Sequence, residues 1–139
     1  MTNDISSRTD IEAIVASFYK RLIDDPAIGF YFTDITAIKL DSHLPKIVAF
    51  WETQLFKRPV YRGNFFEAHK HIHLKAALLK DHFDWWLVLF NKAIDQHAAG
   101  PTAEKMKARA TLIATSMERA LTHNESPTGL IGLGIYTPT

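Results

Sequence analysis

The sequence predicts an all-α protein. Apolar side chains recur three and four residues apart over four long segments, which is the period of a helix with one buried face. No stretch alternates apolar and polar residues over the length of a strand, and the chain has no internal repeat. Proline and glycine separate the periodic segments, at Pro26 and Gly29, at Pro59, and at Gly100 and Pro101. A chain of 139 residues has room for one domain.

The first predicted helix runs from Thr9 to Asp25. Thr9 followed by Glu12 has the spacing of a capping box. The apolar face that follows consists of Ile11, Ile14, Val15, Phe18, Tyr19, Leu22 and Ile23. Tyr19 is unusual in this face, because a buried hydroxyl needs a hydrogen-bond partner unless the tip of the ring reaches the surface.

A second helix is predicted to begin at Asp41, with Pro45 near its first turn. Its apolar positions are Leu44, Ile47, Val48, Trp51 and Leu55, with Phe50 beside them. His43 lies one turn before Ile47, a position typical of a half-exposed histidine near a helix start. The segment before this helix is aromatic without a clear period, so we expect a corner there with Phe32 pointing inward.

Three histidines gather in YRGNFFEAHKHIHLKAALL, residues 61–79. Asn64 and Glu67 fit the cap of a short helix that carries Phe65, Phe66, His69, Ile72 and His73. On a helix His69 and His73 share one face, whereas His71 points about 200° away from His69. At most two of the three can therefore serve one site. We expect His71 to face solvent, and His73 to lie at a pocket edge or to act as a cap.

Two further helices complete the predicted fold. One runs from Lys75 or Ala76 to His97, and its apolar face consists of Leu78, Leu79, His82, Phe83, Trp86, Leu87, Phe90 and Ile94. The last runs from Thr102 to Thr122, with Met106, Ala110, Ile113, Ala114, Met117, Ala120 and Leu121 inward. His82, His97 and His123 are taken as ordinary helix residues. We expect a flexible N-terminus over residues 1–8, one domain over 9–123 and a loosely ordered tail over 124–139.

Composition excludes several classes of function. Sixteen basic and fifteen acidic residues give a net charge of +1, which provides no basic face for nucleic acid and no polybasic membrane patch. No apolar run approaches the length of about 20 residues that spans a bilayer. Because the chain has no cysteine, any metal must be held by histidine, carboxylate, tyrosine or methionine. We expect a soluble cytoplasmic protein with neither nucleic-acid nor membrane partners.

Aromatic side chains are unusually frequent on these apolar faces. They include Phe18, Tyr19, Phe32, Phe50, Trp51, Phe65, Phe66, Phe83, Trp85, Trp86 and Phe90. One interpretation is an aromatic core; the other is a flat apolar cofactor that lies among the rings and is held by one histidine.

Three segments in order and spacing favour the second interpretation. HLPKIVAFW at 43–51, YRGNFFEAH at 61–69 and HFDWWLVLF at 82–90, preceded by Phe18 and Tyr19, resemble the third group of truncated globins over about residues 8–122. None of the six glycines forms a Gly-Gly pair, whereas the first two groups of that family carry such pairs at helix junctions.

The resemblance implies a globin-like, two-over-two helical sandwich around haem b. The pattern Tyr-x-Gly-x5-His matches Tyr61, Gly63 and His69, which makes His69 the proximal iron ligand. The same matching places Tyr19, His43 and Trp86 on the distal side, with His43 also a possible sixth ligand of the iron. Further haem contacts are implied for Phe32, Lys46, Ile47, Phe50, Phe65, Phe66, Ile72 and Phe83, with Lys46 placed for a propionate. Relatives often have Arg in place of Trp85, so propionate contacts are expected to shift to Lys46, Arg62 or Lys70.

The implied function is the binding of O2, nitric oxide, carbon monoxide or cyanide. The O–H of Tyr19 and the Nε1–H of Trp86 can stabilise a ligand that gains negative charge, which should slow O2 release. That argues against bulk O2 transport and for redox chemistry of the nitric oxide dioxygenase or peroxidase kind with a reductase partner. Two other classes stay open: a zinc or nickel site of His69, His73 and Glu67, and a helical interaction protein without a cofactor.

Overall fold

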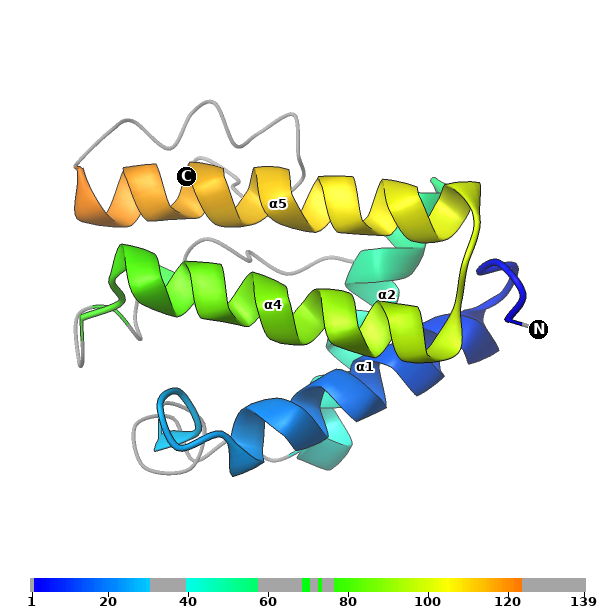
Figure 1. Cartoon of the computed structure of the whole chain (residues 1–139), viewed down its shortest axis with the longest axis horizontal. Helices are drawn as coiled ribbons and strands as arrows, with labels where there is room; N and C mark the ends of the chain where they lie inside the picture. The colour runs from blue at the N-terminus through cyan, green and yellow to red at the C-terminus, as the bar shows by residue number, and fades with distance from the viewer. Residues whose placement is uncertain (1, 31–39, 58–68, 71–72, 74–76, 124–139) are drawn as a thin grey trace.

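The computed structural model describes residues 2–30, 40–57, 69–70, 73 and 77–123. Within these ranges the regular elements are helices: α1 (Arg8–Asp24), α2 (Leu40–Phe56), α4 (Lys80–His97) and α5 (Pro101–Thr122) (Figure 1). His69, Lys70 and His73 also have helical conformation. The predicted all-α class is confirmed. In the described part of the chain no helix is long and apolar enough to cross a bilayer.

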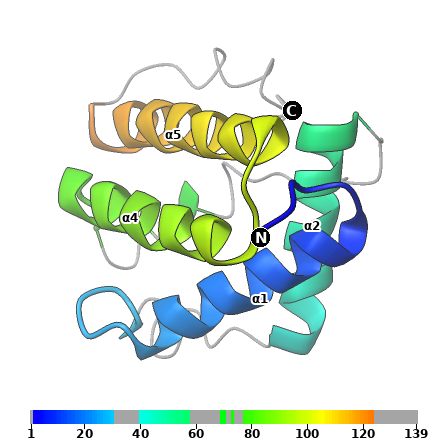
Figure 2. The ribbon, with the colours of Figure 1, turned by 45° about the vertical axis from the view of Figure 1, so that its right-hand side comes forward.

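The four helices form two pairs that pack against each other. α4 and α5 lie side by side and antiparallel, joined by a short connection, as both views show (Figures 1 and 2). α1 packs against both α2 and α4, and α2 also contacts α5. The core therefore lies where α1 and α2 meet the α4–α5 pair.

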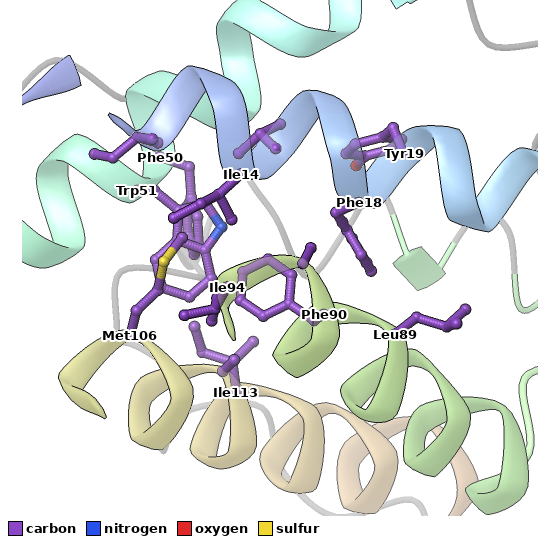
Figure 3. Packing of buried hydrophobic residues seen from close by; sticks show 14 of the residues in the cluster. Ile14, Phe18, Tyr19, Phe50, Trp51, Leu89, Phe90, Ile94, Met106 and Ile113 are labelled. Carbon is purple, nitrogen blue, oxygen red and sulfur yellow. The ribbon is translucent and has the colours of Figure 1, made fainter. Parts of the chain in front are cut away.

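Aromatic rings from three helices meet at Phe90 of α4. Phe18 of α1 points at it edge-on (Figure 3), and the two ring centroids are 4.8 Å apart. Trp51 of α2 and Trp86 of α4 both stack on it at 5.2 Å. Phe90 itself is 1% exposed. Because offset and edge-on ring pairs are favourable beyond their buried area, this cluster fixes α1, α2 and α4 relative to one another.

The start of α1 differs from the prediction. The helix begins at Arg8 with Ser7 as its N-cap, so the expected Thr9 and Glu12 capping box is wrong. The Asp10 carboxylate instead accepts hydrogen bonds from the backbone N–H groups of Ser6 and Ser7, at 2.8 and 3.1 Å. Capping carboxylates stabilise a helix start by satisfying N–H groups that lack intrahelical partners.

Arg8 also joins α1 to α2. Its guanidinium pairs with Glu52, a buried carboxylate on α2, and contacts Glu12 on its own helix at 3.3 Å. A carboxylate that is 4% exposed requires such a partner, because burial of an uncompensated charge is costly.

α4 begins at Lys80, later than predicted, and side chains bind the backbone N–H groups of the two residues before it. The Nδ1 of His73 accepts the N–H of Leu78 at 2.9 Å. The Nδ1 of His82 accepts the N–H of Leu79, also at 2.9 Å. Residues 77–79 are not helical. The expectation that His82 is an ordinary helix residue was therefore wrong, since it caps α4.

The other helix ends are close to those predicted. The starts of α2 and α5 nevertheless show features that the sequence did not indicate. α2 begins at Leu40, so Pro45 lies inside the helix rather than in its first turn. α5 has Pro101 at its first position, and the Asp4 carboxylate accepts the N–H groups of Thr102 and Ala103 at 2.9 and 2.8 Å. The N–H of Ala99 binds the Asn3 carbonyl at 3.1 Å. The polar composition of this N-terminal segment does not reveal these contacts.

Candidate functional site

Tyr19 on α1 and His43 on α2 meet at the predicted distal side. The Tyr19 hydroxyl and the Nε2 of His43 are 2.8 Å apart, a hydrogen-bond distance. The two rings meet edge-on, with centroids 5.1 Å apart. Tyr19 is 7% exposed, so the alternative of a core ring with its tip at the surface does not hold. The sequence did not indicate a hydrogen-bond partner for this hydroxyl; in the structure the partner is His43, 24 residues further along the chain.

Both members of this pair are neutral at physiological pH. Burial raises the pKa of the Tyr19 hydroxyl above its ordinary value. Burial, and then the positive charge of Lys46, lower the pKa of His43. A neutral imidazole has one N–H and one acceptor nitrogen, so either the Tyr19 O–H donates to Nε2 or an Nε2–H donates to the Tyr19 oxygen.

Trp86 on α4 joins the same region through Phe18. The Phe18 ring meets Tyr19 at 5.4 Å and Trp86 at 5.5 Å between centroids, in both cases edge-on. Trp86 is half-buried and also stacks on Phe90. Phe18 therefore links two of the predicted distal residues, which lie on different helices.

The remaining predicted contacts divide into three sets. Ile47 and Phe83 are half-buried and packed against the core, in company with Leu44 and Leu87. Phe50 is 1% exposed and packs edge-on against Trp51 at 5.5 Å, whereas Lys46 is exposed. The third set lies outside the described residues: Phe32, Arg62, Phe65, Phe66, His71 and Ile72, together with Tyr61 and Gly63.

Trp85 has a partner that the sequence did not suggest. Its Nε1–H donates to the Asp25 carboxylate at 2.8 Å, although the two residues are 60 positions apart. The indole is 38% exposed. Nothing in the spacing of Asp25 or Trp85 could have indicated this contact, because it depends on how α1 crosses α4.

One solved structure has this arrangement of helices. The crystal structure of group III truncated hemoglobin from Campylobacter jejuni matches with a TM-score of 0.79, covering 91% of this chain and 99% of that one. The fold is that of a truncated globin. The two sequences are 20% identical, so the match establishes the fold alone. No family model and no curated protein matches this chain.

Within the truncated-globin fold, the structure describes two histidines of the 61–79 segment. His69 and His73 are both helical and half-buried. The Nδ1 of His73 accepts the N–H of Leu78, a residue outside the helix, and this contact occupies that nitrogen. Ligation of a metal through the other nitrogen would require a proton on Nδ1, where it would meet the Leu78 N–H. His73 is thus poorly suited to be a second metal ligand.

The zinc or nickel alternative involves residues that the structure describes only in part. Among the residues that the structure describes, no group of three or more histidine, aspartate or glutamate side chains is placed to hold a metal ion. Glu67, the carboxylate of that alternative, lies outside them.

Proposed function

We propose that this protein binds haem b and holds small diatomic ligands, with His69 as the proximal ligand and Tyr19, His43 and Trp86 on the distal side. The observation that carries the proposal is the neutral, hydrogen-bonded pair of Tyr19 and His43, linked by Phe18 to Trp86, within a truncated-globin fold. Because the solved structure is only 20% identical in sequence, the assignment of these roles rests on the residues of this chain and not on that match.

The described side chains fit a flat apolar group. Leu44, Ile47, Phe83, Trp86 and Leu87 pack against the core and are only partly buried, so each retains apolar surface that such a group would cover. The donor set also fits, because a neutral imidazole is the usual axial ligand of globin haem. We propose that the exposed ammonium groups of Lys46 and Lys70 hold the propionates, since Trp85 is engaged with Asp25.

When bound, haem supplies the iron centre at which a diatomic ligand is held; the chain's own residues determine how tightly. In one tautomer of His43 the Nε2–H donates to the Tyr19 oxygen, and the hydroxyl hydrogen can then turn toward a ligand that carries partial negative charge. Trp86 offers a second donor, its Nε1–H. Preorganised donors in a water-poor site favour such a ligand strongly.

Slow ligand release is the functional consequence. A site with two donors suits ligand capture or redox chemistry with O2, nitric oxide or peroxide, supported by a reductase, better than the unloading that bulk transport requires. Carbon monoxide and cyanide would be further small ligands of the same site.

Addition of hemin tests the proposal and the choice of proximal ligand. The purified chain should show an intense Soret band. His69→Ala should lose the native axial coordination, whereas the matched variant His73→Ala should keep it, because His73 is engaged with Leu78. Absorption and resonance Raman spectra report the coordination.

Two results would contradict the proposal at different points. The reverse pattern for the two alanine variants would move the proximal ligand to His73. A chain that binds no hemin but binds Zn²⁺ or Ni²⁺ stoichiometrically would favour the zinc or nickel site over the haem site.

A further inference from the structure

The carboxylate of Asp25 connects the end of α1 to α4. One oxygen, Oδ1, accepts the backbone N–H groups of Ala27 and Ile28 at 2.8 and 3.1 Å. The other, Oδ2, accepts the indole N–H of Trp85 at 2.8 Å. The two oxygens thus make different connections, because one closes the turn after α1 and the other reaches α4.

The turn that carries Asp25 is tightly closed. The N–H of Gly29 binds the Asp25 carbonyl at 2.9 Å. A Cβ at Gly29 would lie 2.4 Å from the Ile23 carbonyl oxygen and 2.7 Å from that of Asp25, which no side chain tolerates. Ile28 in the same turn is 5% exposed. The position of the Asp25 carboxylate is therefore set by the backbone around it.

Polar contacts help to hold Trp85. Its ring is 38% exposed, and the ammonium of Lys92 lies 5.9 Å from the ring centroid. Because more than a third of its surface is open to solvent, the indole depends for part of its orientation on the hydrogen bond to Asp25.

The neighbouring residue on α4 is Trp86, a distal donor in the proposed function. Successive residues of a helix are about 100° apart, so Trp85 points outward while Trp86 turns toward Phe18 and Phe90. Tyr19 lies within α1, and Asp25 directly follows its last residue. The hydrogen bond from Asp25 to Trp85 therefore joins the end of α1 to α4 beside Trp86, whose donor must converge with that of Tyr19.

We propose that the hydrogen bond between Asp25 and Trp85 is a positioning contact that sets where the Trp86 indole lies relative to Tyr19. Trp85 and Asp25 touch no ligand in this proposal; they act through Trp86 on the rate of ligand release. The predicted effect on ligand release rests on the proposed function. The effect on the position of Trp86 can be measured without haem.

The chain offers a matched control at the other end of α4. The Gln96 side-chain oxygen accepts the hydroxyl of Ser17 at 3.2 Å and the guanidinium of Arg21 at 2.8 Å. This contact also joins α1 to α4 through polar side chains. It lies ten positions after Trp86, about 15 Å along the helix. Loss of the Gln96 contact should weaken the helix pair without moving Trp86.

The test uses the 139-residue chain with fluorinated tryptophan and three variants. Trp85→Phe keeps an aromatic ring and removes the donor. Trp85→Gln restores a neutral N–H donor of similar reach, and Gln96→Ala is the control. The ¹⁹F resonance of Trp86, assigned with Trp86→Phe, should shift or broaden in Trp85→Phe, return toward the wild-type position in Trp85→Gln, and stay unchanged in Gln96→Ala.

The haem-loaded protein provides the second measurement. The O2 dissociation rate should rise about fivefold in Trp85→Phe, the order expected from one lost hydrogen bond, and stay within about twofold in Trp85→Gln and Gln96→Ala. A Trp86 resonance and an O2 rate that do not respond to Trp85→Phe in a haem-binding protein would overturn the positioning role and leave the proposed function intact. A chain that binds no hemin would overturn the proposed function, while the ¹⁹F result would still decide whether Trp85 positions Trp86.

Discussion

At the scale of single residues, the pair of Tyr19 and His43 determines what the site can do. Each ring is neutral because burial disfavours its charged form. Each is also the hydrogen-bond partner of the other, with the Tyr19 hydroxyl oxygen and the Nε2 of His43 2.8 Å apart. When the Tyr19 O–H donates to Nε2, the pair presents the Tyr19 oxygen as an acceptor; when the Nε2–H donates to that oxygen, the hydroxyl can donate to a ligand. A ligand that accepts hydrogen bonds would select the tautomer in which His43 donates to Tyr19.

Removal of the Tyr19 hydroxyl tests this selection. We expect Tyr19→Phe to raise the O2 dissociation rate about tenfold or more, because a hydrogen bond to a partly charged acceptor is lost. The change also removes the partner of the His43 Nε2, so the low-spin fraction of the ferric protein should increase as His43 becomes able to act as the sixth iron ligand. Stopped-flow kinetics and absorption spectra measure the two effects.

Trp86→Phe is the companion variant. It keeps a ring that can stack on Phe90 and removes only the indole donor, so it should raise the O2 rate without a low-spin increase. Unchanged O2 rates in both variants would exclude the two donors from ligand binding. Disappearance of the low-spin form in His43→Ala, but not in Tyr19→Phe, would identify His43 as its source.

At the scale of helices, the ends are where prediction from sequence failed. Leu78 and Leu79 continue the apolar period of α4 toward its N-terminus, so the pattern indicates a helix there. Their N–H groups are bound instead by His73 and His82, and the backbone of residues 77–79 is not helical. Apolar spacing records which face is buried; it does not record where a side chain competes for a backbone donor.

The cap on α5 is a second contact of this kind. Asp4 accepts two of the first N–H groups of α5, and a carboxylate there also interacts favourably with the helix dipole. We expect Asp4→Ala to lower the free energy of unfolding by about 1 kcal/mol, as the loss of a helix cap usually does. Urea denaturation followed by circular dichroism provides the measurement.

The neighbouring residue supplies the control for that experiment. Asn3 contributes its backbone carbonyl to the Ala99 N–H, so Asn3→Ala should change stability by less than about 0.5 kcal/mol. Equal effects of the two substitutions would show that the Asp4 carboxylate does not cap α5.

At the scale of the whole molecule, the sequence predicted the helices and their class because each one carries a long, regular apolar face. The site was predictable only in part. Tyr19 could be identified as a buried hydroxyl in need of a partner, but its pairing with His43 depends on how α1 crosses α2. The contact of Asp25 with Trp85, and the convergence of Phe18, Trp51 and Trp86 on Phe90, depend in the same way on helix crossings.

The same contacts predict how stability depends on pH. Partial burial opposes ionisation of Asp4, but the N–H groups of Thr102 and Ala103 outweigh it and lower its pKa; the pKa of Asp10 is lowered chiefly by the N–H of Ser6. A carboxyl with a lowered pKa in the folded state stabilises the protein above its unfolded pKa, near pH 4, and this stabilisation disappears as the pH falls through the folded value. His43, whose pKa is also lowered, adds a loss that begins below about pH 6.5.

Thermal unfolding from pH 8 to pH 3 checks this expectation. The melting temperature should decline gently below about pH 6.5 and more steeply below about pH 4. The steep part should be reduced in a variant with both Asp4→Asn and Asp10→Asn, compared with the wild type. An unchanged steep part in the double variant would assign acid unfolding to other groups.

The contact of Asp4 with the start of α5 also constrains the order of events during synthesis. Residues 3–5 are synthesised about a hundred residues before their partners at residues 99–103. The face of α1 that packs on α4 likewise has no partner until residues 80–97 have been translated. Ile11, Ile14 and Val15, which are fully buried in the finished protein, therefore belong to a nascent chain that can bury them against α2 but not yet against α4.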